Sequence, residues 1–212
     1  VMLAHANKRV QRGIQPLAAA REVLRRDGVD AVTLRGIARE GGFTNPALYR
    51  HYSSKQALLE ALIREVYGDF LQVIIRAGAG SNPRESLIRG LQAFREFAIE
   101  DPNGFELLFL RPRTHQLDVW PHDHRSKNPS RGFTLLVNGV SAAMDPDSKG
   151  PDPVYAALSC HAHALGLVSL YRGGRFGTDV EAFREFFDHA MLIHLGALIG
   201  SDPIFESKRS QP

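Results

Sequence analysis

The 212-residue sequence predicts an all-α protein, for three reasons. Apolar and polar residues rarely alternate over a stretch long enough for a strand, and no Asn-Gly pair joins two β-rich runs. Helix starts recur as Asn or Asp followed by Pro, because the first side chain accepts free N–H groups and proline at the first helical position loses nothing. Apolar residues return every three or four positions in the longer segments. Together these patterns predict about nine helices.

Three short helices are expected first. One spans Gln15–Asp27 and stops at Gly28, and the next spans Leu34–Glu40 with Thr33 as its cap. The third spans Asn45–His51, where asparagine precedes proline. Glycine after a helix and threonine before one are the usual end and start signals, so these boundaries follow from the sequence.

Longer helices follow. A fourth, over residues 54–77, has a continuous apolar side, and Ser53 with Gln56 has capping-box spacing before it. The fifth helix begins after Asn82, and Glu85 stands three residues after Asn82, which is again capping-box spacing. The stretches 111–127 and 145–150 are the least regular and are expected to be loops. The remaining helices are expected at residues 83–99, 102–110, 129–144, 153–171 and 179–199, with Thr178 and Glu181 at the last start and Gly173-Gly174 after the eighth helix.

Positive charge is concentrated near the N-terminus. Residues 1–60 hold ten Lys or Arg and five Asp or Glu, a sum of +5, whereas the remaining residues sum to −2. A basic segment on a slightly acidic body favours binding to a polyanion. Ordinary variation of a solvated surface is the alternative that charge alone leaves open.

The segment Thr33–Lys55, TLRGIAREGGFTNPALYRHYSSK, predicts a helix-turn-helix. Its first helix buries Leu34 and Ile37, and the following glycine pair permits the positive φ of a sharp turn. Its second helix has little to bury beyond Leu48 and presents several hydrogen-bond donors. In such a motif the second helix enters the major groove of DNA. The alternative is an amphipathic helical corner with solvated polar residues.

The donors of this segment divide by chemistry. Hydroxyl, imidazole and ammonium groups on its flanks suit phosphate oxygens, and Lys55 lies in the first turn of the next helix, where free N–H groups also attract phosphate. Base edges are left to small and polar residues of the second helix. The predicted DNA contacts are Thr33, Arg35, Thr44, Asn45, Pro46, Ala47, Tyr49, Arg50, His51 and Lys55.

The segment from Gly28 through Leu62 resembles the DNA-binding domain of TetR-family transcriptional regulators and covers about a fifth of the chain. Three positions depart from the family pattern. Tyr52 stands where phenylalanine is usual, Gly41 where alanine is usual, and Pro16 interrupts the start of the first helix. The matching residues are Thr33-Leu34-Arg35, Ile37-Ala38, Gly42, Leu48-Tyr49-Arg50-His51-Tyr52 and Ser54-Lys55 before Leu58.

This resemblance implies a homodimer with a helix-turn-helix domain over residues 1–56 and a ligand-binding and dimerisation domain over 57–212. The last two helices are apolar on more than one face, which suits both a subunit core and a partner, although a well-buried helix in a monomer would look alike. The predicted dimer interface is Leu158, Leu165, Phe183, Phe187, Met191, His194 and Leu198. The predicted effector pocket is Phe94, Phe97, Phe105, Phe109, Phe133, Leu136 and His161, most of which are also expected core residues.

The C-terminal half resembles, more weakly, a TetR subgroup with a Trp-x-x-x-His-Gly pattern on its eighth helix. The stretch Phe94–Phe109 fits that subgroup, and Gly166 fits the pattern. His161, however, stands at the Trp position and Leu165 at the His position. A function that depends on that Trp or His is therefore not carried over.

Other chemistry is weakly indicated. The segment His115–His124, HQLDVWPHDH, and the pair Cys160 and His163 contain metal-ligand types without the spacing of a structural zinc site. An alternative is that His161, His163, His189 and His194 line the effector pocket and donate hydrogen bonds to the ligand. No catalytic frame and no phosphate-binding glycine loop is recognisable. We predict no metal, no cofactor and no enzymatic activity.

The cellular setting is predicted to be the cytoplasm. A single cysteine excludes an internal disulfide and favours a reducing compartment. The sequence contains no run of about 18 apolar residues, so no membrane span is predicted. Its start also lacks an apolar segment of signal-peptide length.

The sequence thus predicts a bacterial DNA-binding transcriptional regulator. The expected mechanism, taken from the resemblance, is a repressor dimer that binds a palindromic operator and is released by a small, mostly apolar effector. Two alternatives remain: a ligand-independent or architectural DNA-binding protein, and a helical enzyme or carrier.

Overall fold

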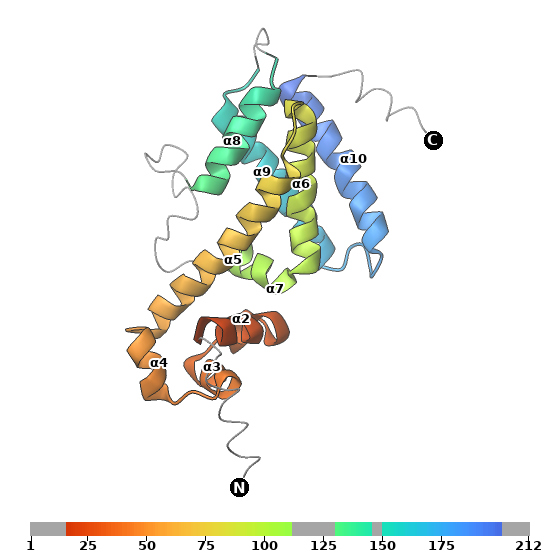
Figure 1. Ribbon diagram of the computed structural model, residues 1–212. Coiled ribbons are helices and arrows are strands. Elements are labelled where there is room, and N and C mark those ends of the chain that lie inside the picture. The colour runs from red at the N-terminus through yellow and green to blue at the C-terminus, as the bar shows by residue number, and fades with distance from the viewer. Residues whose placement is uncertain (1–15, 112–129, 146–149, 201–212) are drawn as a thin grey trace. The chain divides into compact units, whose positions relative to one another are not determined.

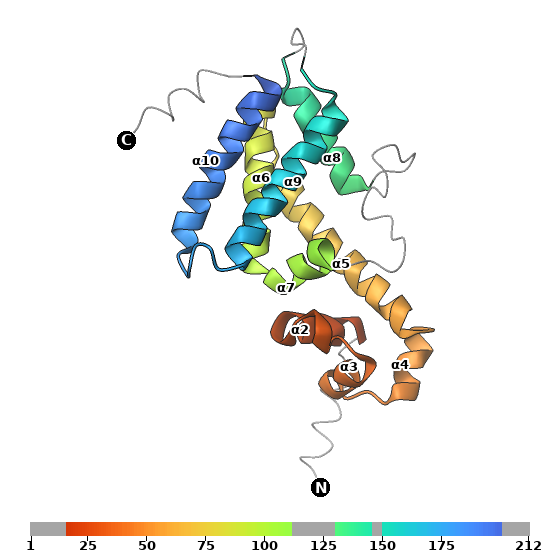
Figure 2. The ribbon, with the colours of Figure 1, turned by 180° about the vertical axis from the view of Figure 1, so that it is seen from behind.

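A computed structural model describes residues 16–111, 130–145 and 150–200. Within these ranges the chain forms nine α-helices and no strand, so the predicted all-α class is confirmed (Figures 1 and 2). A 3₁₀ turn, η1, spans Val29–Ala31, and a π-helical turn, η2, spans Glu106–Leu110. The α-helices are α2 (Pro16–Asp27), α3 (Leu34–Gly41), α4 (Asn45–His51), α5 (Lys55–Ala77), α6 (Pro83–Glu100), α7 (Pro102–Phe105), α8 (Arg131–Ala143), α9 (Pro153–Arg172) and α10 (Val180–Ile199).

Most helix boundaries lie within two residues of those predicted, because the start signals are real caps. Thr33 accepts a hydrogen bond from the N–H of Gly36 at 3.0 Å, and the Asn82 side chain accepts from the N–H groups of Arg84 and Glu85. The predicted irregular loops fall mostly on residues 112–129 and 146–149, which lie outside the described residues.

The capping residue differs from the prediction at four starts. Thr44 caps α4, not Asn45, and Ser54 accepts the N–H of Ala57 at the start of α5, not Ser53. Asp179 caps α10, not Thr178, and Ser130 caps α8, which begins two residues later than predicted. In each case a second capping side chain stands one or two positions from the predicted one, which at α8 was Asn128, so spacing alone selects a position only to within one or two residues.

The contacts divide the described residues into two compact units. Unit 1 comprises residues 16–69 and 100–111, and unit 2 comprises residues 70–99, 130–145 and 150–200. The helices α5 and α6 each pass from one unit to the other. This division differs from the boundary predicted after residue 56, which remains a prediction: α7 and η2 group with the N-terminal helices.

The core of unit 1 is apolar and lies among α2, α3, α4 and the first half of α5. The helices α2 and α3 pack together, and α3 also packs against α4. Ile37 and Leu48 are buried as predicted, whereas Leu34 is half-buried. The fully buried side chains include Ala20, Val23, Leu24, Ile37, Leu48, Leu58 and Leu62.

In unit 2, α9 lies between α8 and α10 and packs against both (Figure 2). By length and mean hydropathy α9 alone among the described helices could cross a membrane, although core helices of soluble proteins have the same properties. Its residues Ala156, Ala157, Cys160, Ala164 and Val168 are at most 1% exposed. An apolar helix packed on two neighbours needs no membrane to explain it.

Candidate nucleic-acid interface

The turn between α3 and α4 gives the helix-turn-helix its shape. Gly42 adopts the left-handed conformation at φ 66° and ψ 26°, which ends α3. The N–H of Phe43 donates to the carbonyl of Ala38 at 2.9 Å, and the Thr44 hydroxyl then accepts from the N–H of Ala47 at 3.4 Å. These bonds fix α4 directly after α3.

The short helix α4 buries one side chain and exposes most of the others. Leu48 is 1% exposed and anchors the helix in unit 1, whereas Tyr49 on the next position is 53% exposed. Arg50 and His51 are also exposed, and Pro46 is exposed in the first turn. A helix held by one apolar anchor leaves its remaining surface available to a partner.

The flanks of α4 provide exposed polar groups on neighbouring elements. Thr33 and Arg35 are exposed at the start of α3, and Lys55 is exposed as the first residue of α5. The first-turn N–H groups of a helix and its dipole favour an anion at that end. Lys55 adds a full positive charge there.

The charges of unit 1 are distributed so that cations near α4 remain unpaired. Glu22 binds Arg25 at 2.7 Å, and both Asp27 and Glu40 bind Arg26 at 2.8 Å. Within the described part of the chain, by contrast, no carboxylate lies within ion-pair distance of Arg35, Arg39, Arg50 or Lys55. The carboxylates of Glu22, Asp27 and Glu40 are thus paired with α2 arginines, whereas these four exposed cations on α3, α4 and α5 have no such partner, which suits a polyanion.

Most predicted DNA contacts therefore lie on a contiguous set of elements, the start of α3, α4 and the start of α5. Ala47 is half-buried, so it offers less surface than expected, and Asn45 begins α4. Arg39, exposed in the last turn of α3, was not predicted. Its position on the same helix as Arg35 was the only signal that could have identified it.

The predicted effector-pocket residues fall into both units. Phe94, Phe97 and Phe133 are 5–7% exposed in unit 2, where Phe94 meets the ring of His161 edge-on with centroids 5.5 Å apart. Burial lowers the pKa of His161 to about 4, so its imidazole is neutral at pH 7. Leu136 and His161 also belong to unit 2, whereas Phe105 and Phe109 pack together in unit 1 with centroids 4.9 Å apart.

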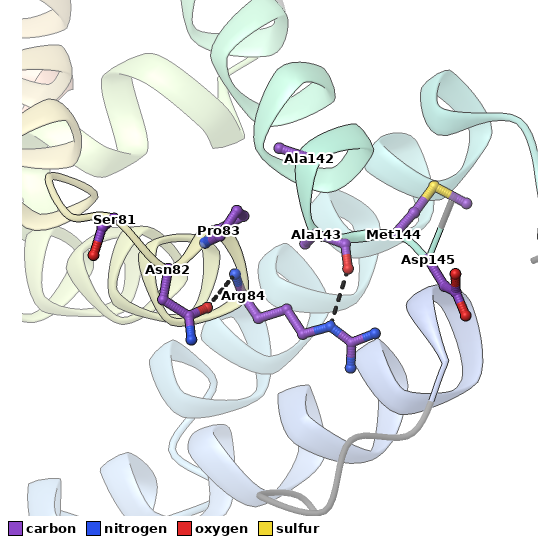
Figure 3. A pocket seen from close by; sticks show the side chains of 8 residues that line it. All are labelled: Ser81, Asn82, Pro83, Arg84, Ala142, Ala143, Met144 and Asp145. Carbon is purple, nitrogen blue, oxygen red and sulfur yellow. Dashed lines mark hydrogen bonds between the residues drawn. The ribbon is translucent and has the colours of Figure 1, made fainter. Parts of the chain in front are cut away.

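A surface hollow of about 570 Å³ lies elsewhere in unit 2, between the start of α6 and the end of α8 (Figure 3). None of the predicted pocket residues lines it. Two charged residues, Arg84 and Asp145, line it. Arg84 donates to the carbonyls of Ala143 at 3.1 Å, Ile199 at 3.2 Å and Gly200 at 3.3 Å. Arg84 thus closes the C-terminal ends of α8 and α10, which is a structural role.

The predicted dimer residues are only partly available to a partner. Phe183 and Phe187 are fully buried and Met191 is 4% exposed, all within unit 2, so these three are core residues of the single chain, and their place in a dimer interface stays a prediction. Leu158, Leu165, His194 and Leu198 are half-buried. The large apolar side chains exposed on α9 and α10 are instead Tyr155, Leu170, Phe186 and Ile193. The seven-residue spacing of Phe186 and Ile193 was the signal for this second face.

No described group of three or more His, Cys, Asp or Glu side chains could hold a metal ion. His163 and His194 stack with centroids 4.4 Å apart and planes 8° apart, and His194 Nε2 lies 3.2 Å from the Ser159 hydroxyl. Burial raises the pKa of the Cys160 thiol to about 11. The segment His115–His124 lies outside the described residues.

The fold and the basic helix-turn-helix define a DNA-binding transcriptional regulator. Residues 17–62 match the family described as bacterial regulatory proteins, tetR family, and residues 87–193 match the tetracyclin repressor-like C-terminal domain. The chain belongs to the TetR family of bacterial transcriptional regulators.

Named relatives agree with this family. The HTH-type transcriptional regulator Rv0681 of Mycobacterium tuberculosis is 26% identical over 200 residues, which cover 91% of this chain and 87% of the relative. The class D tetracycline repressor protein of Escherichia coli is 33% identical over 102 residues, 48% of this chain and 46% of the repressor. The transcriptional activator FasR of Mycolicibacterium smegmatis is 31% identical over 102 residues, 48% of this chain and 47% of FasR.

Solved structures share the fold. A regulatory protein, SCO4313, has a TM-score of 0.63 at 22% identity and covers 91% of this chain and 98% of its own. A TetR variant from Acinetobacter baumannii AYE in complex with minocycline has a TM-score of 0.57 at 20% identity, with coverage of 92% and 97%. At these identities the likeness concerns the fold alone.

Proposed function

We propose that this TetR-family regulator is a ligand-responsive repressor that binds a palindromic operator as a homodimer. The observation that carries the proposal is α4: an exposed short helix anchored by Leu48 and flanked by exposed, unpaired Arg35 and Lys55. A helix of seven residues reads few base pairs, so two copies on two half-sites are needed for affinity and specificity.

The dimer would form through the exposed apolar residues of α9 and α10. Phe186 is 47% exposed and Ile193 is 58% exposed on α10, and Tyr155 and Leu170 are exposed on α9. Two such helices from each chain can bury these side chains in a four-helix bundle, since a partner copy presents the same surface. The DNA-binding heads would then be held at a fixed separation.

A small, mostly apolar effector would bind among the aromatic side chains of unit 2. Phe94, Phe97 and the neutral imidazole of His161 offer apolar surface with a hydrogen-bonding group beside it. Effector binding would release DNA by favouring a conformation in which the two heads have the wrong separation, which requires different affinities for the two states. The complex of a TetR structural neighbour with minocycline supports this expectation.

A second candidate is ligand-independent DNA binding. Phe70 packs edge-on against both Phe94 and Phe97, with centroids 6.1 Å and 5.2 Å apart, which favours a filled core at this place. One named relative, FasR, is a transcriptional activator. The reporter experiment below therefore also distinguishes activation of transcription from repression.

Selection of duplexes from a random pool by the full chain tests the proposal. We expect one palindromic sequence, bound by two chains, and repression of a reporter placed downstream of it. Addition of minocycline and then of other planar aromatic compounds should release the DNA. Selection of no duplex, or binding by a monomer, contradicts the proposal; release by no compound favours the ligand-independent candidate.

A further inference from the structure

Two histidines meet in the seam between the neighbouring helices α9 and α10 (Figure 2). His163 on α9 and His194 on α10 stack with ring centroids 4.4 Å apart and planes 8° apart. His194 Nε2 lies 3.2 Å from the hydroxyl of Ser159, which precedes His163 by one turn of α9. Among the described residues, His163 Nε2 is buried and has no hydrogen-bond partner. The seam therefore holds two titratable rings in direct contact.

No acidic group of the described residues compensates a positive charge on this pair. The charged group that acts on His194 is His163 itself. The helix α8, which packs against α9, has no ionisable side chain except Arg131 at its first residue. On α10 the nearest carboxylate in the sequence is Asp188, which already binds Arg95 and Gln92 of α6. The ionisable groups of α9 and α10 within about two turns of either ring are Cys160, His161, Asp188 and His189.

A proton is therefore unfavourable while the rings stay stacked. Two positive rings at this separation repel each other, so the first proton opposes the second. A protonated imidazole has two N–H donors, and His163 Nε2 has no acceptor within the described residues. Burial, and then His163, lower the pKa of His194, and Ser159 offsets only part of this effect. Protonation thus favours separation of the rings and movement of one of them toward water.

The seam borders the exposed face of α9 and α10. Ala162 and Gly166 stand beside His163, and Ile193 and Ala197 stand beside His194; all four are exposed. In a helix, the residues one before and three after a given position lie on the same side of it, about 100° and 60° away. A β-carbon built on Gly166 meets no atom within 4 Å, so packing within the chain does not require this glycine. Close approach of a second copy would explain it.

We propose that the pair of His163 and His194 makes the dimer acid-sensitive, so that protons separate the two chains and release the regulator from DNA. The inference rests on the proposed homodimer. In the dimer, the partner copy covers the face beside the pair and excludes water, which makes a charge without a carboxylate partner more costly. In the separated chain, a protonated ring can turn into water.

The direction of the pH effect follows from linkage. The separated chain binds a proton more tightly than the dimer does, so acid favours the separated chain. Association is therefore fully present above the ordinary histidine range and weakens as the pH falls through it. Each of the two released chains takes up about one proton, because the first proton opposes a second on the same pair.

The test measures the dissociation constant of the dimer by sedimentation of the labelled full chain at about pH 7.5 and about pH 5.5, on either side of the ordinary histidine value. For the wild type we expect an increase of about ten- to hundred-fold at the lower pH. The double variant His163→Phe/His194→Phe keeps two rings without titratable nitrogens and should change less than about threefold. His189→Gln, at an exposed position of α10, should behave as the wild type.

Release of the selected palindrome should follow the same pattern, and effects of His51 or His161 are common to the wild type and the double variant. Circular dichroism of the same samples shows whether each chain is folded. A second double variant, His163→Gln/His194→Gln, replaces the first if that one does not fold. As a measure independent of any variant, the slope of the logarithm of the wild-type dissociation constant against pH should be about 1 to 2 in magnitude near pH 6.

Three results would overturn the inference. A wild-type slope below about 0.5 in a folded chain overturns acid sensitivity and leaves the proposed function standing. Equal pH dependence in the wild type and a folded double variant overturns the assignment to this pair. A wild type that is monomeric at about pH 7.5 contradicts the proposed homodimer, and the inference fails with it.

Discussion

The ring of Phe43 lies against the α-carbon of Gly41, in the space that a β-carbon at Gly41 would occupy. A β-carbon built there would overlap the Cε2 and Cδ2 atoms of the ring. Gly41 is the last residue of α3 and Phe43 follows the left-handed Gly42, so the ring folds back over the turn. The unusual glycine at position 41 is therefore matched to its aromatic neighbour.

We predict that Gly41→Ala destabilises the protein by about 1 kcal/mol, because the overlap with Phe43 outweighs the helix propensity that alanine gains. In a Phe43→Ala background the same change should be neutral or stabilising. Urea unfolding of the two single variants and the double variant gives the interaction free energy. An equal cost of Gly41→Ala in both backgrounds would show that the ring is not the reason for the glycine.

Removal of Lys55 should weaken DNA binding without changing sequence preference. An exposed lysine at the first turn of α5 suits a phosphate, and each lost phosphate contact lowers the slope of log K against log salt by about 0.9. Lys55→Ala should therefore reduce the slope by about 2 for a dimer. Binding is measured by anisotropy between about 50 and 200 mM salt.

The matched control for this prediction is Arg76→Ala, which removes a positive charge from the last turn of the same helix α5. It should leave the slope unchanged. A Lys55 variant that changes the preferred base sequence instead, or an equal effect of Arg76→Ala, would contradict the phosphate assignment.

The sequence was sufficient to predict the helices and the helix-turn-helix, since these depend on local signals. Thr33, Asn82 and Asp101 act on N–H groups within three residues, and Leu48 is the only large aliphatic residue of its helix. The π turn after α7 was not predicted, because an apolar run such as residues 105–110 fits an α-turn and a π-turn equally well.

The partners of the helix faces could not be predicted in the same way. Asn103 and Arg25 lie 78 residues apart, and no local pattern relates them. On α10, Phe183 and Phe187 are buried while Phe186 is exposed, although all three are phenylalanines within one and a half turns. When a helix is apolar around most of its circumference, composition does not tell which face meets the subunit core.

Acid should destabilise the protein through His161. Burial lowers the pKa of His161 from 6.5 to about 4, so between these values the unfolded chain binds a proton that the folded chain does not. Stability from this group is present above pH 6.5 and is lost as the pH falls, by about 2 kcal/mol between pH 7 and pH 5. Urea unfolding at fixed protein concentration measures the loss.

His161→Leu should remove most of that dependence, whereas His189→Gln, at an exposed position of α10, should retain it. Burial also lowers the pKa of His194, an effect to which the neighbouring His163 adds, so a smaller acid sensitivity should remain in His161→Leu. If His161→Leu and the wild type lose equal stability on acidification, His161 is not the group responsible.

Arg95 should be the most costly charged residue of unit 2 to replace. Its side chain is 8% exposed, donates to Glu96 at 2.8 Å and to the carbonyl of Arg184 at 3.0 Å, pairs with Asp188, and lies over the Phe187 ring at 5.5 Å. Arg95→Ala removes a buried guanidinium that joins α6 to α10 through several hydrogen bonds, although Glu96 keeps Arg184 and Asp188 keeps Gln92 as donors, so we expect a loss of about 3 kcal/mol in the free energy of unfolding.

Arg184 provides the comparison, because it binds the same Glu96 at 2.7 Å with a side chain that is 33% exposed. Arg184→Ala should cost about 1 kcal/mol or less, since solvent screens the pair. Arg95→Lys should lie between the two, because one ammonium cannot replace a planar guanidinium that contacts several acceptors. Equal losses for Arg95→Ala and Arg184→Ala in urea unfolding would mean that burial does not determine the strength of this network.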